Sequence, residues 1–216
     1  MKRRGRPPKG AGPAESVEGR ILDSACRLFY TEGVRATGID RILSRAGAAK
    51  ASLYAHYGSK DDLVRAYLER QAQAWMARVQ ERIAPADGRA GLLRLFEMLG
   101  EFASGEDFRG CPFLNATSEL ADPSHPARAV LRQQREWLHG LIRGLLSSAD
   151  VHDLDRVSRA VVVLYDGALA SAILDEDGGA AAAALFAVER LLDATARSGP
   201  RRARAGAAGA RPRGAG

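Results

Sequence analysis

Residues 37–63 read TGIDRILSRAGAAKASLYAHYGSKDDL, and they contain two short helical patterns joined by a tight turn. Thr37 and Asp40 match the Ser/Thr-x-x-acid pattern, in which a hydroxyl and a carboxylate satisfy free amides of a first helical turn. The first helix is therefore expected to begin at Thr37 and to end near Gly47, a residue that favours a turn. A second helix is expected over about residues 49–57. Two short helices joined in this way predict a helix-turn-helix.

The second of these helices carries side chains suited to base edges in a DNA groove. A helix held by its predecessor across a tight turn enters a major groove about 12 Å wide with its N-terminal residues nearest the bases. Lys50 can donate to guanine or to phosphate, and Ser52 can donate to either. A small residue such as Ala51 lets the backbone approach and offers a methyl contact to thymine. The pattern therefore predicts double-stranded DNA as a partner.

Hydroxyl, imidazole and ammonium groups around this helix are suited to the phosphate backbone. Tyr54, His56 and Lys60 follow on the same approach surface, and Thr37 stands at the start of the preceding helix. Such groups beside helix N-termini position a protein on DNA without reading its sequence. We therefore expect phosphate contacts from these four side chains.

On both sides of this stretch, apolar residues recur at spacings of three and four, with no convincing strand alternation. One helix is expected over about residues 16–31. Ser59 and Asp62 repeat the capping pattern and start a long helix, which Pro85 and Gly88 are expected to stop.

Further amphipathic stripes indicate helices through the rest of the body. Pro112 is expected at the first position of one helix, where its missing amide leaves no hydrogen bond unmade. The last two helices are expected over about residues 154–174 and 179–196. The sequence therefore predicts an all-α fold of about nine helices.

The formal net charge of +6 is concentrated at the two ends of the chain. Residues 1–14 and 198–216 contribute five basic residues each and no acidic residue. Both segments consist mainly of Arg, Gly, Pro and Ala, which bury too little surface to offset the entropy of ordering, so we expect both to be disordered. Arg4 and Arg6 form a pattern that resembles the core of an AT-hook, whose arginines enter a narrow minor groove. A tail that adds only nonspecific attraction is the alternative.

Several classes of protein are disfavoured. Cys26 and Cys111 are the only cysteines, too few and too far apart for a disulfide framework or a zinc site. The histidines lack partners at metal-ligand spacing, so we expect no metal and no cofactor. No apolar run approaches the roughly 18 residues of a membrane span, so we expect a cytoplasmic protein without a membrane partner. A nucleophile with a base, a metal cluster and a phosphate-cradling loop are all missing, so we expect no enzyme and assign no catalytic residue.

A dense pattern extends beyond the two short helices. Residues 21–29 read ILDSACRLF, Gly33 and Thr37 follow, and residues 42–63 complete the pattern. This pattern resembles the N-terminal domain of the TetR family of regulators over roughly residues 16–66.

The resemblance implies roles for individual residues. It implies that the helix at about residues 49–57 reads the groove, and that Tyr54, Lys60 and Thr37 hold phosphates. One departure concerns Ala49, which stands where the family usually has Ser or Thr. This helix therefore lacks a hydroxyl cap and one expected polar contact.

A second pattern lies in the middle of the chain. Residues 108–115 read FRGCPFLN, and DPSHP follows at residues 122–126. This pattern resembles a subgroup of TetR-like regulators that respond to aromatic or electrophilic compounds. The family architecture implies a ligand cavity among the middle helices. It also implies a homodimer in which the last two predicted helices pair with their copies.

Seven side chains are candidates for contact with such a ligand. Asn115 and Glu119 stand one turn apart on a predicted helix, so both can face a cavity, although surface exposure is equally expected for Glu119. Aromatic residues are candidate cavity walls, but at helical spacing they more often belong to a core. These aromatic candidates are Trp75, Phe96, Trp137 and Tyr165.

Cys111 is the seventh candidate. It precedes Pro112 at a predicted helix start and lies near Arg109, so a helix dipole and a guanidinium can stabilise its thiolate. We hypothesise that alkylation or oxidation of Cys111 releases DNA. The alternative is a small packing residue, which is also the interpretation we favour for Cys26.

The sequence therefore predicts a ligand-responsive DNA-binding transcriptional regulator, most simply a repressor that a small molecule releases from a palindromic operator. We expect a basic arm over residues 1–14, a helix-turn-helix domain over 15–62, a ligand-binding and dimerisation domain over 63–197, and a basic tail over 198–216. Two alternatives remain open. One is a constitutive or architectural DNA-binding protein without an effector, and the other is a thiol-based electrophile sensor acting through Cys111.

Overall fold

The computed structural model describes residues 16–83, 88–175 and 179–196, and these residues form nine α-helices and no extended strand. The predicted all-α class is confirmed. The tails, including Arg4 and Arg6, lie outside the described residues, as does Pro85. The helices are α1 (Val17–Glu32), α2 (Ile39–Ala46), α3 (Lys50–Tyr57), α4 (Lys60–Ile83), α5 (Gly88–Ala103), α6 (Pro112–Glu119), α7 (Ala127–Ser148), α8 (Leu154–Leu174) and α9 (Gly179–Thr195).

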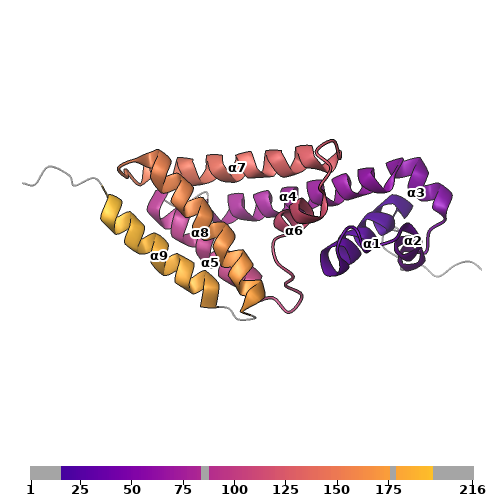
Figure 1. The fold of residues 1–216 in the computed structure, drawn as a ribbon, viewed down its shortest axis with the longest axis horizontal. Helices are drawn as coiled ribbons and strands as arrows, with labels where there is room; N and C mark the ends of the chain where they lie inside the picture. The colour runs from indigo at the N-terminus through magenta and orange to yellow at the C-terminus, as the bar shows by residue number, and fades with distance from the viewer. Residues whose placement is uncertain (1–15, 84–87, 176–178, 197–216) are drawn as a thin grey trace, which may run out of the picture.

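The molecule is elongated, and the helices divide between its two ends (Figure 1). Helices α1, α2 and α3 lie at one end, and α5, α8 and α9 lie at the other. The two longest helices, α4 and α7, run between the ends, and the short α6 lies in the middle. The arrangement places the helix-turn-helix at one tip of the molecule.

The tip has a hydrophobic core of its own, called here the N-terminal core, and α1 to α4 supply most of it. Ile21, Ile42 and Leu53 are fully buried in it. Ala116 of α6, Leu120 just after α6 and three residues of α7 pack into the same cluster. The core therefore crosses the expected boundary after residue 62, which stays a proposed functional division.

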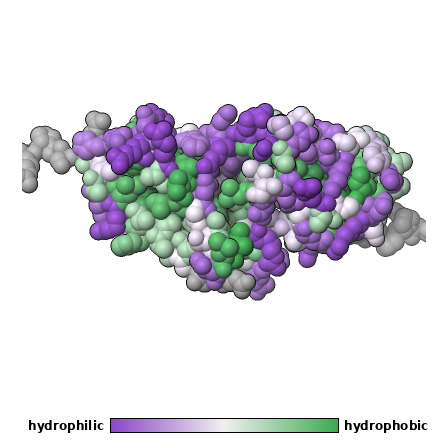
Figure 2. Space-filling model, in the orientation of Figure 1, coloured by the Kyte–Doolittle hydropathy of each residue, from purple (hydrophilic) through white to green (hydrophobic). Residues whose placement is uncertain are grey.

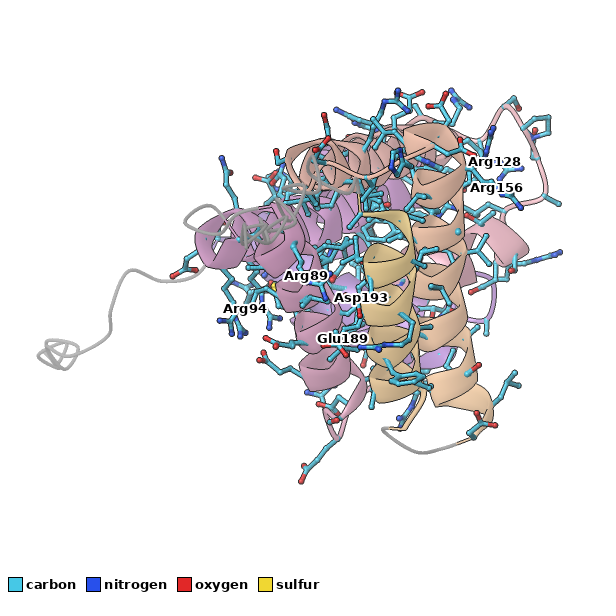
Figure 3. All side chains as sticks on the ribbon, turned by 90° about the vertical axis from the view of Figure 1, so that its left-hand side faces the viewer. Arg89, Arg94, Arg128, Arg156, Glu189 and Asp193 are labelled. Atoms are coloured by element: carbon cyan, nitrogen blue, oxygen red, sulfur yellow. The ribbon has the colours of Figure 1, made fainter. Side chains whose placement is uncertain are left out.

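A larger core fills the opposite end, where the second half of α4 meets α5, α7, α8 and α9. Phe96 and Tyr165 meet edge to face at its centre, with ring centroids 6.3 Å apart. Figure 3 looks onto this end and shows α8 and α9 side by side, with Arg89 of α5 directed towards Asp193 of α9. The two side chains form an ion pair of 2.8 Å, which ties α5 to α9 at the surface.

Helix α4 ends at Ile83, just before Pro85 and Gly88, where the sequence predicted its end, and Gly88 begins α5. A Cβ atom placed on Gly88 would lie 2.2 Å from the carbonyl oxygen of Leu145 near the end of α7. Real contacts of that length do not occur, so only glycine lets α5 start against the backbone of α7.

The predicted helix starts are mostly confirmed by hydrogen bonds. The Asp62 amide donates to the Ser59 hydroxyl at 3.0 Å, and that hydroxyl donates to the Asp62 carboxylate at 2.6 Å. Pro112 stands in the first turn of α6, as expected. The predicted cap at Thr37 is wrong, because α2 begins at Ile39 with Gly38 as its N-cap and no side chain caps it.

Helix α8 is the one described helix that is long and apolar enough to span a membrane by length and composition, with a mean hydropathy of 1.6. This helix corrects the expectation that no apolar segment of the chain approaches the length of a membrane span. Its buried residues, which include Val161, Tyr165 and Leu169, belong to the larger core. Its hydropathy is therefore explained by packing against α5, α7 and α9.

Candidate nucleic-acid interface and ligand cavity

The turn between α2 and α3 sets the direction in which α3 points. Gly47 has φ 58° and ψ 42°, the left-handed conformation that glycine adopts without steric cost. The next amide, that of Ala48, donates to the Leu43 carbonyl at 3.1 Å. This pattern of bonds ends α2 and starts a new helix two residues later.

A single buried side chain anchors α3 to the N-terminal core. Leu53 is the one residue of α3 that is buried, and Tyr57 at the end of the helix donates its hydroxyl to the Glu18 carbonyl at 3.0 Å. Because only one face of the helix is used for packing, the remaining faces are available to a partner.

The predicted base-reading residues lie on these free faces. Lys50 and Ala51 are exposed, and Ser52 is half-buried. Ala49 caps the helix without a side-chain hydrogen bond, as its methyl group dictates. The structure therefore presents the three predicted residues together at the start of α3, and their contact with bases stays a prediction.

The predicted phosphate contacts fall into different environments. Tyr54 is 43% exposed, and Lys60 is half-buried at the first position of α4. In the part of the chain that the structure describes, neither Lys50 nor Lys60 has an ion-pair partner. His56 is exposed, but its Nδ1 lies 4.0 Å from a Glu18 carboxylate oxygen. A protonated His56 therefore has an intramolecular partner in addition to any phosphate.

Thr37 is the exception, and its predicted phosphate contact is corrected. Its side chain is 0% exposed, and its hydroxyl donates to the carbonyls of Gly33 at 2.7 Å and Leu28 at 3.3 Å. The hydroxyl thus satisfies backbone oxygens at the end of α1. It fixes the connection from α1 to α2 from inside and does not face a partner.

Two cavities lie in the other half of the molecule, on either side of three residues that line both. These residues, called here the shared wall, are Cys111, Phe113 and Tyr165. The smaller cavity, between α4, α5, α6 and α8, has a volume of about 100 Å³. The larger cavity, beside α6, α7 and α8, has a volume of about 530 Å³.

Trp75 lines the smaller cavity, as predicted, and presents a polar atom there. Its indole Nε1 is buried and makes no hydrogen bond of ordinary geometry in the described residues, and the Tyr165 hydroxyl is a polar group close to it. Phe102 stands beside its ring at a centroid distance of 6.0 Å, and the Arg78 guanidinium lies over it at 5.9 Å. A buried donor without an acceptor is unfavourable, so the indole offers a hydrogen bond to any small occupant.

Tyr165 also lines the cavities, as predicted, whereas three other candidates do not lie on either lining. Phe96 is 1% exposed and packs behind Tyr165. Trp137 packs half-buried against the larger core. Asn115 donates its side-chain amide to the Arg109 carbonyl at 2.7 Å. These three residues support the walls and the loop, and their prediction as ligand contacts is corrected.

The expected activation of Cys111 is reversed by its surroundings. Burial raises the pKa of the Cys111 thiol, and backbone hydrogen bonds at the start of α6 oppose that effect without overcoming it. Burial likewise raises the pKa of Cys26 to about 11. Both thiols are therefore neutral at physiological pH, as expected of packing residues.

Several polar contacts that the sequence did not predict connect the cavity region to the tip. The Tyr30 hydroxyl donates to the Gly110 carbonyl at 3.0 Å, next to Cys111. At the other end of α6, a Glu119 carboxylate oxygen accepts the backbone amide of Arg35 at 2.7 Å. The loop that leads into α6 is thus bonded to α1, and the last residue of α6 is bonded to the connection that follows α1.

The sequence of this chain is similar to those of known bacterial regulators. The family model "Bacterial regulatory proteins, tetR family" matches residues 21–67. Over 142 residues the chain is 30% identical to the uncharacterized HTH-type transcriptional regulator YezE of Bacillus subtilis, covering 62% of this chain and 71% of YezE. Over 127 residues it is 30% identical to the HTH-type transcriptional regulator LmrA of the same species, covering 55% of this chain and 65% of LmrA.

A solved structure extends the similarity to the whole fold. A TetR-family transcriptional regulator from Streptomyces coelicolor is 32% identical and superposes with a TM-score of 0.79. The superposition covers 83% of this chain and 95% of that chain. The similarity therefore includes the cavity region as well as the tip.

Proposed function

Because this chain belongs to the TetR family of bacterial regulatory proteins, which are DNA-binding transcriptional regulators and not enzymes, we propose that it is a repressor released from its operator by a small molecule. The observation that carries the proposal is the presentation of α3, which buries Leu53 alone and leaves its other faces to solvent. A DNA-binding role also implies that the protein works in the cytoplasm.

In this proposal α3 lies in the major groove. Lys50, Ala51 and Ser52 meet base edges, while Tyr54 and Lys60 contact phosphates on either side. The helix places its polar side chains near its N-terminus, which is the end that enters the groove in helix-turn-helix proteins. Arg4 and Arg6 precede the described residues and are proposed to follow the neighbouring minor groove.

Members of the family bind operators as dimers, and we propose α8 and α9 as the dimer surface. Three large apolar side chains on these helices are unusually exposed: Val163 at 67%, Leu174 at 81% and Phe186 at 63%. Figure 2 shows hydrophobic surface over α8 and α9 on the face that Figure 1 presents. Contiguous exposed apolar surface of this kind marks an interaction site, and a second copy supplies a matching one.

Release is proposed to act through α6. The shared wall is formed partly by Cys111 and Phe113 at the start of α6, and Glu119 at its end accepts the Arg35 amide near α2. A ligand that prefers one position of α6 therefore shifts the population of tip orientations. When the two recognition helices of a dimer no longer match successive major grooves, the operator is released.

Footprinting on the intergenic DNA beside the protein's own gene tests the proposal. We expect protection of one palindromic site whose half-sites lie about 34–36 Å apart or a multiple of that distance. Diffuse protection would contradict it and would favour the architectural alternative.

Size-exclusion chromatography with light scattering tests the dimer surface. Phe186→Asp should give monomers with greatly reduced operator affinity, because it places a charge in an apolar interface. Gln133→Asp, on the exposed face of α7, is the control and should remain dimeric. A dimeric Phe186→Asp variant would exclude α9 from the interface.

A further inference from the structure

Of the two cavities on the shared wall, the larger one has a size that suits an organic ligand. Pockets that hold small molecules have volumes of about 300–1,000 Å³. The larger cavity, at about 530 Å³, falls within that range, whereas the smaller one, at about 100 Å³, does not. The larger cavity therefore has room for an organic effector beside α7.

One side of this cavity is basic. Arg128, Arg132 and Arg135 all line it, and their spacing of four and three residues places them on one face of α7. Arg135 is neutralised by Asp166 of α8 through contacts of 2.8 and 2.7 Å. Arg128 and Arg132 have no ion-pair partner among the residues that the structure describes.

The acidic residue nearest to Arg128 in the sequence is already engaged elsewhere. Asp122 accepts hydrogen bonds from the Ser124 hydroxyl at 2.7 Å and the Ser124 amide at 2.8 Å. These bonds are the main reason why the pKa of Asp122 is lowered, and Arg128 contributes less. Two guanidinium groups are therefore available to a ligand at the cavity.

Much of the remaining lining of the cavity is apolar. Leu114 of α6, Leu131 and Leu138 of α7 and the ring of Tyr165 line it. Gln134, whose side chain is buried, lies between the two α7 leucines in sequence and also lines the cavity. The cavity thus combines an apolar wall with a pair of cations.

We propose that the effector is a carboxylic acid with an apolar body, held by Arg128 and Arg132 through its carboxylate. This inference rests on the proposed function and names the ligand class of that same site. Guanidinium groups bind carboxylates through two parallel hydrogen bonds, and the leucines and Tyr165 accommodate the hydrocarbon part. The ligand also touches α6 through Leu114, so its binding acts on the helix that Glu119 joins to the tip.

The test compares 2-naphthoate with 2-naphthamide, which share an apolar body and differ in charge. In isothermal titration calorimetry of the full chain without DNA, we expect the acid to bind at least about tenfold more tightly than the amide, because charged hydrogen bonds exceed neutral ones. Arg128→Gln and Arg132→Gln should each weaken acid binding about tenfold and leave amide binding unchanged. Either variant alone suffices if the other fails to fold.

Arg156→Gln is the matched control. Arg156 is an exposed arginine of α8, ten residues before Asp166, which corresponds to roughly 15 Å along the helix. Arg128 lies in the first turn of α7 and Arg156 in the first turn of α8, and Figure 1 shows that these two helices begin towards opposite ends of the molecule. The control should bind both compounds as the unmodified chain does.

Three results would overturn the proposal: no binding of the acid, equal affinity for acid and amide, or acid affinity unchanged in both arginine variants. Inorganic phosphate that binds as tightly as the acid would also overturn it, since charge alone would then select the ligand. An acid that binds while the operator complex stays intact would support the ligand class and contradict the release step of the proposed function. Failure to find an operator would leave the calorimetric result standing.

Discussion

At the tip, one buried leucine holds α3 while Lys50, Tyr54 and their neighbours face solvent; at the opposite end, Tyr165 lies within the packing of α8. The tip presents its candidate DNA-binding side chains on its surface. In the cavity region, a candidate ligand-binding side chain such as Tyr165 is buried between helices. Surface groups at the tip should therefore be separable from stability, whereas groups near the cavity should not be, and substitutions can test this difference.

The largest effect on stability is expected at Leu53, the residue of α3 whose side chain is buried in the N-terminal core. Leu53→Ala should lower the free energy of unfolding by about 3 kcal/mol, because it removes the one buried contact of α3 and leaves a void. Urea denaturation followed by circular dichroism measures this loss. Ala51→Ser on the exposed face should change stability by less than about 0.5 kcal/mol. A loss near zero at Leu53 would show that α3 is held by other contacts.

The reactivity of the two cysteine thiols tests whether burial between helices suppresses the chemistry of a side chain. With a pKa of about 11 in place of 9.0, Cys26 has about 100-fold less thiolate at pH 8 than an ordinary cysteine, and the raised pKa of Cys111 acts in the same direction. Alkylation by iodoacetamide at pH 8, followed by mass spectrometry, should therefore be much slower in the native chain than in urea. For Cys26 the native rate should rise as the pH approaches 11. Rapid native labelling of Cys111 would restore the thiol-sensor hypothesis.

A smaller effect separates affinity from stability at the tip. Tyr54→Phe should weaken operator binding about tenfold, the value of one hydroxyl hydrogen bond to a charged phosphate, while unfolding changes by less than about 0.5 kcal/mol. Fluorescence anisotropy at several salt concentrations measures the affinity. Because the lost group is neutral, the salt dependence should stay constant, whereas Lys60→Gln, which removes a charged phosphate contact, should reduce its slope by about one. Unchanged affinity would remove Tyr54 from the phosphate contacts.

The smallest effect concerns the connection between the two regions. Glu119→Ala removes the acceptor of the Arg35 amide and should cost about 1 kcal/mol of stability. Glu119→Gln keeps an acceptor and should recover most of this loss. Once an effector is known, the Glu119→Ala variant should also release a smaller fraction of bound DNA than the unmodified chain at equal effector occupancy. Identical release in both variants would mean that the coupling runs outside this bond.

Local patterns in the sequence predicted the helices well, because their signals lie within a few residues. Ser59 with Asp62, and Pro112 at the start of α6, formed the expected starts. Thr37 with Asp40 presents the same kind of pattern, yet no cap forms there. The Thr37 hydroxyl instead bonds to the end of α1, a tertiary contact that outweighs the local preference.

The cavities were only partly predictable, because their linings come from helices far apart in the sequence. Trp75 and Tyr165 were identified as aromatic wall candidates, but the same reasoning selected Phe96, which packs behind the wall. The arginine row of α7 was missed, although its spacing on one helix face is a signal that the sequence contains. The bond between Glu119 and the Arg35 amide joins residues 84 apart, and no local pattern reports such a pair.

The N-terminal core is completed by Ala116 of α6 and by Leu120, which follows α6, and this matters for protein engineering. A chimeric regulator can be designed by joining the DNA-binding domain of one protein to the ligand-binding domain of another. A graft cut after residue 62 would set a foreign α6 against Ile21 and its neighbours, and mismatched volumes there would loosen the DNA-binding domain. Functional transplants from this chain should therefore carry the matching residues of α6 and α7 along with the DNA-binding domain, as one co-adapted unit.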